Sequence, residues 1–140
     1  MGAAYAKLHR TWQFWHAGDV AGTTDKEIHK AATALRSVFM TEQWMCSHVY
    51  KVGDPDRFRM FAILNPGRSQ LTLKLADPDR AELLIEAGVG QPNAHLPRGG
   101  WITLLTDRLE PDDVADRLSV SHGMAAKGLP RVARLKFGLD

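Results

Sequence analysis

The spacing of hydrophobic residues after residue 23 predicts an amphipathic helix with one buried face. Apolar side chains recur three or four residues apart, at Ile28, Ala31, Leu35 and Phe39. Thr24 and Glu27 precede them at the spacing of a capping box, in which a hydroxyl and a carboxylate satisfy free amides of the first helical turn. We therefore interpret Thr24 and Glu27 as structural residues and expect Phe39 on the buried face of this helix.

The pattern changes from helical to alternating in the middle of the chain. Residues 48–52 and 57–64 are typical of two strands, and the Gly-Asp-Pro-Asp sequence between them supplies turn residues. Residues 65–67, Asn-Pro-Gly, predict a second turn because proline fixes φ and glycine accepts a positive φ. Residues 71–75 alternate leucine with polar side chains, as in an antiparallel strand with one buried and one solvated face. Together these segments predict a three-stranded meander.

The second half of the chain predicts a helix, further strands and a final helix. The Asp-Pro pair at 77–78 suits the start of a helix that stops near residue 88. Residues 101–105 have a strand pattern, and residues 91–96 are a candidate for a short strand before them. A last helix is expected over about 111–128, where acidic residues near its start would interact favourably with the helix dipole.

The summed order is helix, three strands, helix, one or two strands, helix. A meander buries one face, and amphipathic helices can cover that face, so the predicted fold is an α+β two-layer sandwich. We expect an antiparallel sheet of four to five strands with the helices on one face. Strict alternation of strands and helices is absent, which disfavours a doubly wound parallel sheet.

Length and composition agree with a single folded domain. The chain has 140 residues, of which 44% are hydrophobic and 24% charged, values usual for a soluble globular protein. We predict an N-terminal extension with a short helix over residues 1–22, one domain over 23–130 and a basic C-terminal tail over 131–140. No apolar run approaches the length of a bilayer span, and the N-terminus lacks a secretory signal pattern.

Cysteine usage bears on the cellular compartment. Cys46 is the single cysteine, which excludes an internal disulfide and any cysteine-rich zinc module. Its neighbours Trp44 and Met45 are apolar, which favours a packed and unreactive thiol. We therefore expect a cytoplasmic protein that does not bind a membrane.

Sequence motifs of catalysis and metal binding are missing. The chain contains no dinucleotide-binding or phosphate-loop glycine pattern and no nucleophile elbow, and no two of its six histidines are four residues apart. Ser121 and His122 are adjacent, but neighbouring helical residues point about 100° apart, so we interpret them as a structural serine and a surface histidine. We expect no enzyme activity, no catalytic or metal-ligating residue and no cofactor.

Two groups of residues are candidates for binding. The formal net charge is only +2, yet several basic residues cluster near predicted turns and could contact phosphates: Lys51, Arg57, Arg59, Arg68, Lys74 and Arg98. The alternative is a solvated sheet face partly neutralised by acidic neighbours. A candidate ligand pocket comprises His48, His95 and Trp101, the last two flanking a glycine-containing loop. The alternative is that Trp101 packs in the core and Arg98 is solvated in a turn.

Ordered motifs over about residues 45–131 resemble the MmcQ/YjbR-like family. The segments are His48-Val-Tyr-Lys-Val, Met60-Phe-Ala-Ile-Leu, Leu71-Thr-Leu-Lys-Leu-Ala, His95-Leu-Pro-Arg-Gly-Gly-Trp-Ile-Thr-Leu and Lys127-Gly-Leu-Pro. The resemblance implies a small α+β fold similar to a frataxin-like or secretion-chaperone-like arrangement. It also implies DNA binding through a double wing of hairpins, and it carries over no catalytic residue. This chain departs from the family pattern before Trp101, where a histidine is replaced by Pro97-Arg98-Gly99-Gly100.

Two functions remain open on the sequence. The first is a DNA-binding or regulatory protein that uses basic hairpins as wings. The alternative is a non-catalytic module that binds a small molecule or a protein partner near the loop before Trp101. A contiguous pocket with basic residues scattered elsewhere would favour the second function. The chain is compatible with a monomer or a homodimer.

Overall fold

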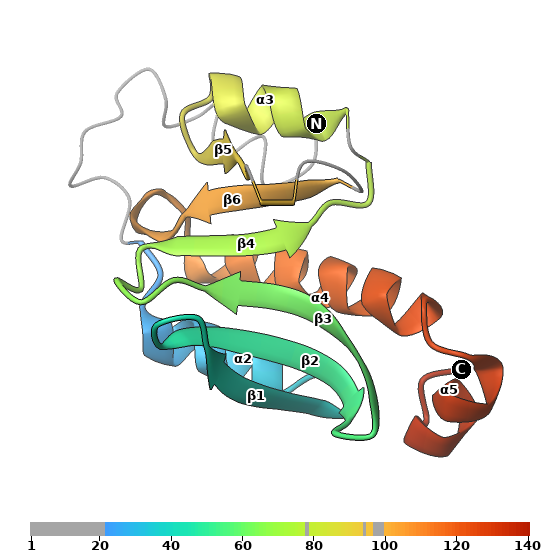
Figure 1. Ribbon diagram of the computed structural model, residues 1–140. Coiled ribbons are helices and arrows are strands. Elements are labelled where there is room, and N and C mark those ends of the chain that lie inside the picture. Colours follow the sequence, from blue (N-terminus) through green and yellow to red (C-terminus); the bar gives the residue numbers. More distant parts are fainter. Residues whose placement is uncertain (1–21, 78, 94, 97–99) are drawn as a thin grey trace.

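The computed structural model describes residues 22–77, 79–93, 95–96 and 100–140 (Figure 1). The helix expected in the N-terminal extension and the candidate residue Arg98 lie outside the described residues. No helix in the described ranges has the length and apolar character needed to cross a bilayer.

The centre of the fold is an antiparallel sheet of six strands in the order β1-β2-β3-β4-β6-β5 (Figure 1). The strands are β1 (Val38–Gln43), β2 (Ser47–Asp54), β3 (Arg57–Leu64), β4 (Gln70–Lys74), β5 (Gly90–Pro92) and β6 (Trp101–Leu105). Strands β1 to β4 form a meander, and β6 inserts between β4 and the short edge strand β5.

Helices cover one face of this sheet, as predicted. The helices are α2 (Asp25–Thr33), α3 (Arg80–Glu86), α4 (Pro111–Lys127) and α5 (Arg131–Phe137), with a 3₁₀ turn η2 (Thr106–Arg108) before α4. Figure 1 shows α2 and α4 behind the sheet, α3 beside β5, and α5 beyond the β2–β3 hairpin. The predicted α+β two-layer sandwich is therefore confirmed. The sheet has six strands, whereas four to five were predicted.

The additional strand comes from a segment that the sequence placed in a helix. Helix α2 ends at Thr33, and Ser37 then takes a positive φ of 58° that turns the chain back toward the sheet. Phe39 consequently lies in β1, where its Cα pairs with that of Lys51, and not on a helix face. The capping box was predicted correctly, because the Glu27 amide donates to Thr24 Oγ1 at 3.2 Å and the Thr24 amide donates to Glu27 Oε1 at 2.9 Å.

The C-terminal segment also differs from its prediction. Residues 131–140 were expected to be a basic tail, but Arg131–Phe137 form helix α5. Ala133 of this helix is buried and belongs to the hydrophobic core. The cationic side chains therefore belong to a helix packed on the domain and not to a tail outside it.

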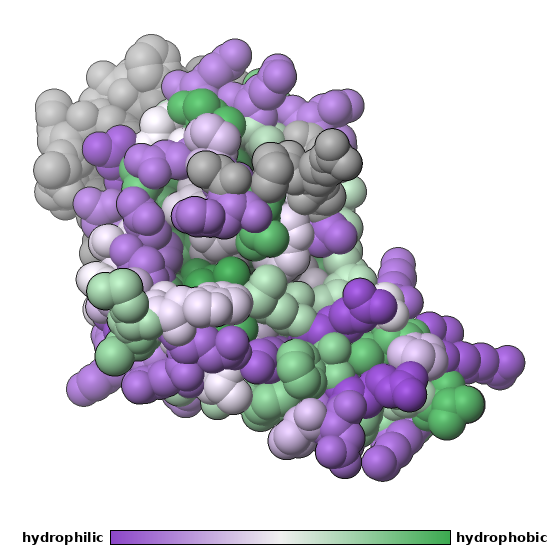
Figure 2. Space-filling view, viewed as in Figure 1, coloured by the Kyte–Doolittle hydropathy of each residue, from purple (hydrophilic) through white to green (hydrophobic). Residues whose placement is uncertain are grey.

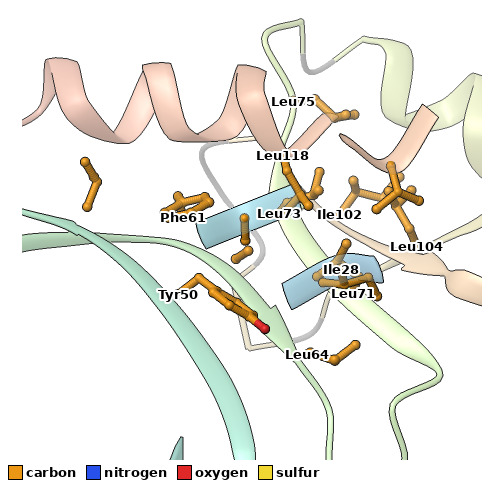
Figure 3. Packing of buried hydrophobic residues seen from close by; sticks show 14 of the residues in the cluster. Ile28, Tyr50, Phe61, Leu64, Leu71, Leu73, Leu75, Ile102, Leu104 and Leu118 are labelled. Atoms are coloured by element: carbon orange, nitrogen blue, oxygen red, sulfur yellow. The ribbon is translucent and has the colours of Figure 1, made fainter. Parts of the chain in front are cut away.

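The hydrophobic core lies between the sheet and helices α2 and α4 (Figure 3). Its large buried side chains include Ile28, Tyr50, Phe61, Leu64, Leu71, Leu73, Ile102, Leu104 and Leu118. Ser121 Oγ on α4 is fully buried, donates to the Phe61 carbonyl at 2.7 Å and accepts from the Lys74 amide at 2.9 Å. His122 is buried as well, with Nε2 at 2.8 Å from the Arg36 carbonyl, so its expected surface position was wrong.

Candidate functional site

The sheet face opposite α2 and α4 carries the candidate site. A row of partnered residues crosses four strands on this face: Val49, Ile63, Thr72 and Thr103. Alternation along β4 and β6 directs the leucine and isoleucine neighbours of the two threonines into the core instead. The space-filling view shows apolar surface in a hollow on this side, with hydrophilic groups around it (Figure 2).

A groove of about 590 Å³ occupies this face, and we call it the open-face groove. Its apolar lining residues are Trp44, Met60, Ile63 and Leu96, and its polar lining residues are Ser47, Asn65, Gln70, Thr72, Asn93, His95 and Thr103. None of these described lining residues is Lys, Arg, Asp or Glu. Since a phosphate or another full charge would find no permanently charged partner among them, the groove suits an uncharged ligand.

Three side chains form a hydrogen-bonded floor in the groove. Thr72 Oγ1 and Thr103 Oγ1 are 2.8 Å apart, and Asn93 Nδ2 donates to them at 3.2 and 3.1 Å. The threonine–threonine bond uses one of the two hydroxyl hydrogens, and Asn93 Nδ2 supplies amide hydrogen to both oxygens. Within the described structure, one threonine hydroxyl hydrogen is therefore left for an acceptor in the groove.

Asn93 also fixes the wall above this floor. Its Oδ1 accepts from the backbone amides of His95 at 2.9 Å and Leu96 at 3.0 Å. The same side chain thus joins the threonine pair to the segment that carries two lining residues. This places Asn93 as a positioning residue for the groove.

The β1–β2 hairpin brings Trp44 to the groove through an unusual turn. Trp44, Met45 and Cys46 have positive φ angles of 49°, 65° and 75°, a region that residues other than glycine seldom occupy. Arg68 Nη1 holds the turn by donating to the Cys46 carbonyl at 2.8 Å, and Ser47 Oγ donates to the Trp44 carbonyl at 3.2 Å. The turn also exposes Cys46, so the expected packed thiol was wrong.

The five basic candidates that the structure describes do not share one surface. Lys51 is 9% exposed, with Nζ at 4.4 Å from the ring centroid of Phe58, a cation–π contact on the open face. The Arg68 guanidinium is already hydrogen-bonded at two hairpin turns, because it donates to the Asn65 carbonyl at 3.1 Å as well as to the Cys46 carbonyl. Lys74 lines a separate cavity beside α4.

Arg57 and Arg59 are exposed on the β2–β3 hairpin. The cationic residues of α5, which were predicted to form a tail, also lie at this hairpin. Arg59 lies against the end of α4. Its Nε is 3.4 Å from the position that a Cβ on Gly128 would occupy. Lys136 of α5 contacts Asp54 of the same hairpin, with Nζ 3.6 Å from Oδ2. Two of the six candidates therefore belong to a different surface from the open-face groove.

The predicted pocket residues are only partly brought together. His95 lines the open-face groove, whereas His48 and Trp101 are not among its lining residues. His48 Nε2 instead lies 3.5 Å from Glu42 Oε1 on β1, and Trp101 pairs with Lys74 at the start of β6. The alternation of leucine and polar residues over 71–75 indicated the solvated face that includes Thr72. No sequence pattern marked Trp44 or Asn93, because these residues reach the groove through turns.

Metal binding has no support in the described residues, among which no three His, Cys, Asp or Glu side chains form a group able to hold an ion. One strongly perturbed group lies on the other side of the sheet. Burial raises the pKa of Tyr50 to about 12, and its hydroxyl is 3.0 Å from His29 Nδ1 on α2. This pair belongs to the packed layer and not to the open-face groove.

Comparisons with known proteins identify the fold and the family. The chain is similar to the crystal structure of Deinococcus radiodurans protein DR2400, which has a DUF419 domain, with a TM-score of 0.75. The two share 24% sequence identity, and the match covers 86% of this chain and 92% of that chain, so this likeness establishes the fold. No curated protein matches the chain. The YjbR family model matches residues 33–124, more than half of the sequence. The chain therefore belongs to the YjbR family.

Proposed function

We propose that this protein is a non-catalytic binding module that holds a small uncharged molecule in the open-face groove. The observation that carries the proposal is a groove of about 590 Å³ whose described lining is apolar or neutral polar, with one unused hydroxyl hydrogen on its floor. Ligand pockets typically enclose about 300–1,000 Å³ and combine apolar walls with a few placed polar groups.

The arrangement specifies two features of the ligand. An aromatic or aliphatic body would pack against Trp44, a residue that is 59% exposed, and against Met60 and Leu96. A carbonyl or ether oxygen would accept the free hydrogen of the Thr72–Thr103 pair. An ionised group would be disfavoured, because it would lose hydration without gaining a counter-charge from the described lining.

The proposal includes no chemical step, because the groups that could act as nucleophiles are engaged elsewhere. Ser47 Oγ donates to the Trp44 carbonyl, and the threonine hydroxyls bond to each other and to Asn93. The described part of the groove therefore lacks a hydroxyl paired with a base, which nucleophilic catalysis needs.

The proposal can be tested by screening uncharged fragments against ¹⁵N-labelled protein. Binding fragments should shift the amide resonances of Thr72, Asn93 and Thr103, and fragments that carry an oxygen acceptor should predominate. The double variant Thr72→Val/Thr103→Val, which removes both hydroxyl donors of the pair, should weaken these fragments about tenfold, the equivalent of one hydrogen bond. Thr41→Val is the matched control, since Thr41 lies on the edge strand β1 outside the groove lining. A screen in which no fragment shifts the groove resonances would overturn the proposal.

The second candidate function is nucleic-acid binding, favoured by a separate surface that we call the basic corner. It consists of cations on the β2–β3 hairpin, the end of α4 and α5: Arg57, Arg59, Lys127, Arg131, Arg134 and Lys136. Nearby carboxylates are fewer, namely Asp54, Asp56 and Asp140. Backbone hydrogen bonding from Arg57 lowers the pKa of Asp54, so this carboxylate stays ionised and offsets part of the charge.

Nucleic-acid binding predicts a response to charge removal and to salt. The variant Arg57→Gln/Arg59→Gln should weaken binding of a fluorescein-labelled random duplex. It should also reduce the slope of log affinity against log salt concentration by the amount expected for about two phosphate contacts. Lys26→Gln/Lys30→Gln, on the exposed side of α2, removes the same charge elsewhere. Equal affinities for the two double variants would exclude the basic corner as a binding surface.

A further inference from the structure

A second cavity, separate from the open-face groove, lies beside the first half of α4. It has a volume of about 430 Å³ and is lined by the end of β4, the connection that follows it, α3 and α4. We call it the α4 cavity. Its apolar lining includes Leu75 and Val120, and its charged lining includes Arg80 and Arg117.

Arg117 has an unmet hydrogen-bonding requirement in this cavity. Its Nε atom is buried and has no hydrogen-bond partner in the described structure. Buried donors are nearly always paired, and a guanidinium donor left without an acceptor is costly. The orphaned Nε therefore indicates an acceptor that the protein itself does not supply.

The electrostatic surroundings define what kind of acceptor would fit. Desolvation by burial lowers the pKa of the Arg117 guanidinium, Asp113 and Asp116 raise it, and Arg80 lowers it further. Three cations and three carboxylates line the cavity: Lys74, Arg80 and Arg117 against Asp77, Asp113 and Asp116. Because the acids would repel a multiply charged anion, a single negative charge suits this lining best.

We propose that the α4 cavity binds a small monocarboxylate, with one carboxylate oxygen accepting the Arg117 Nε hydrogen and a short aliphatic body packed against Leu75 and Val120. A carboxylate matches the planar donors of a guanidinium and forms a charge-assisted hydrogen bond with them. The apolar wall provides contact for carbon atoms, which inorganic phosphate would not use.

Butyrate is a suitable probe for this site. In wild-type protein, butyrate should shift the Arg117 Nε–H resonance and the amides of Leu75 and Val120, saturating at millimolar concentration. Butanol, which has the same body without the charge, and inorganic phosphate, which has charge without the body, should each bind at least about tenfold more weakly.

Substitution separates a binding role of Arg117 from a structural one. Arg117→Lys keeps the positive charge but removes the Nε donor, and it should weaken butyrate about tenfold. Arg131→Lys is the matched control, because the Arg131 side chain is 77% exposed on α5. If Arg117→Lys unfolds the protein, the Arg117 Nε–H shift in wild type remains decisive. No shift of that resonance with butyrate, equal binding by both variants, or tighter binding of phosphate would overturn the proposal.

Discussion

Ser121 is predicted to contribute more to stability than its small side chain suggests. Its Oγ is fully buried and forms two hydrogen bonds that join α4 to two strands, donating to the Phe61 carbonyl at 2.7 Å and accepting from the Lys74 amide at 2.9 Å. Ser121→Ala would remove one acceptor and one donor and leave both backbone groups unsatisfied.

The magnitude follows from these two bonds. An unsatisfied buried polar group costs about 1–3 kcal/mol, so two of them lower the free energy of unfolding by about 2–6 kcal/mol. The serine hydroxyl itself no longer has to be desolvated in the variant, which favours the lower half of this range. A loss of about 2–4 kcal/mol is therefore expected, a large part of the 5–15 kcal/mol typical of a domain.

Urea denaturation followed by circular dichroism measures this loss directly. Ser119→Ala is the matched control, because Ser119 is exposed on the same helix, and it should change the free energy of unfolding by less than about 0.5 kcal/mol. The urea dependence should keep the wild-type slope for both variants. Should Ser121→Ala match Ser119→Ala, the buried hydroxyl would not be the link between α4 and the sheet.

The remaining predictions concern the hairpin turns, helix α4 and the buried Tyr50. Arg68→Ala should lower the free energy of unfolding by about 1–3 kcal/mol in urea denaturation, since the Cys46 and Asn65 carbonyls lose a charged donor. An unchanged free energy of unfolding would show that Arg68 does not stabilise these turns. Gly53→Ala should destabilise by more than about 1 kcal/mol, because φ is 122° and a Cβ would lie 2.2 Å from the Arg57 carbonyl oxygen. Gly123→Ala, with no atom within 4 Å of the new Cβ, should instead stabilise α4 by about 0.5–1 kcal/mol. If Gly53→Ala and Gly123→Ala changed the free energy of unfolding in the same direction, the backbone geometry at these two glycines would be contradicted. Burial raises the pKa of Tyr50 from 10.0 to about 12, so the unfolded chain ionises first and stability falls between these pH values. Tyr50→Phe should not show this loss of stability, which amounts to up to about 2–3 kcal/mol. If the free energies of unfolding of the variant and the wild type fell in parallel above pH 10, the raised pKa of Tyr50 would be refuted.

Local periodicity was sufficient to predict most of the sheet and its covering helices. Alternation through residues 71–75 identified β4, and the apolar side of the last helix identified the packing surface of α4. Strand β1 was missed because Phe39 continues the helical spacing of Ile28 and Leu35, while the decisive event is the positive φ at Ser37. In that turn the Gly53 amide donates to the Ser37 carbonyl, a long-range bond that sequence spacing does not reveal.

The candidate site was less accessible to sequence reasoning than the fold. Basic residues near turns indicated phosphate contacts, but Lys51 packs over aromatic rings and Arg68 holds a hairpin turn. The open-face groove draws residues from β2, β3, β4, β6 and three connections, so its composition depends on strand order. His95 alone of the predicted pocket residues lines it.

The central claim, ligand binding in the open-face groove, is tested most directly by ¹⁹F NMR of protein labelled with 5-fluorotryptophan. Of the four tryptophans in the chain, Trp44 lines the groove and Trp101 does not, so these two rings provide a site probe and an internal reference, the latter assigned with Trp101→Phe. The Trp44 signal can be assigned with Trp44→Phe. Saturating amounts of an uncharged, oxygen-containing fragment should shift the Trp44 signal and leave the Trp101 signal in place. A fragment that binds while the Trp44 signal stays unchanged would contradict the proposed site.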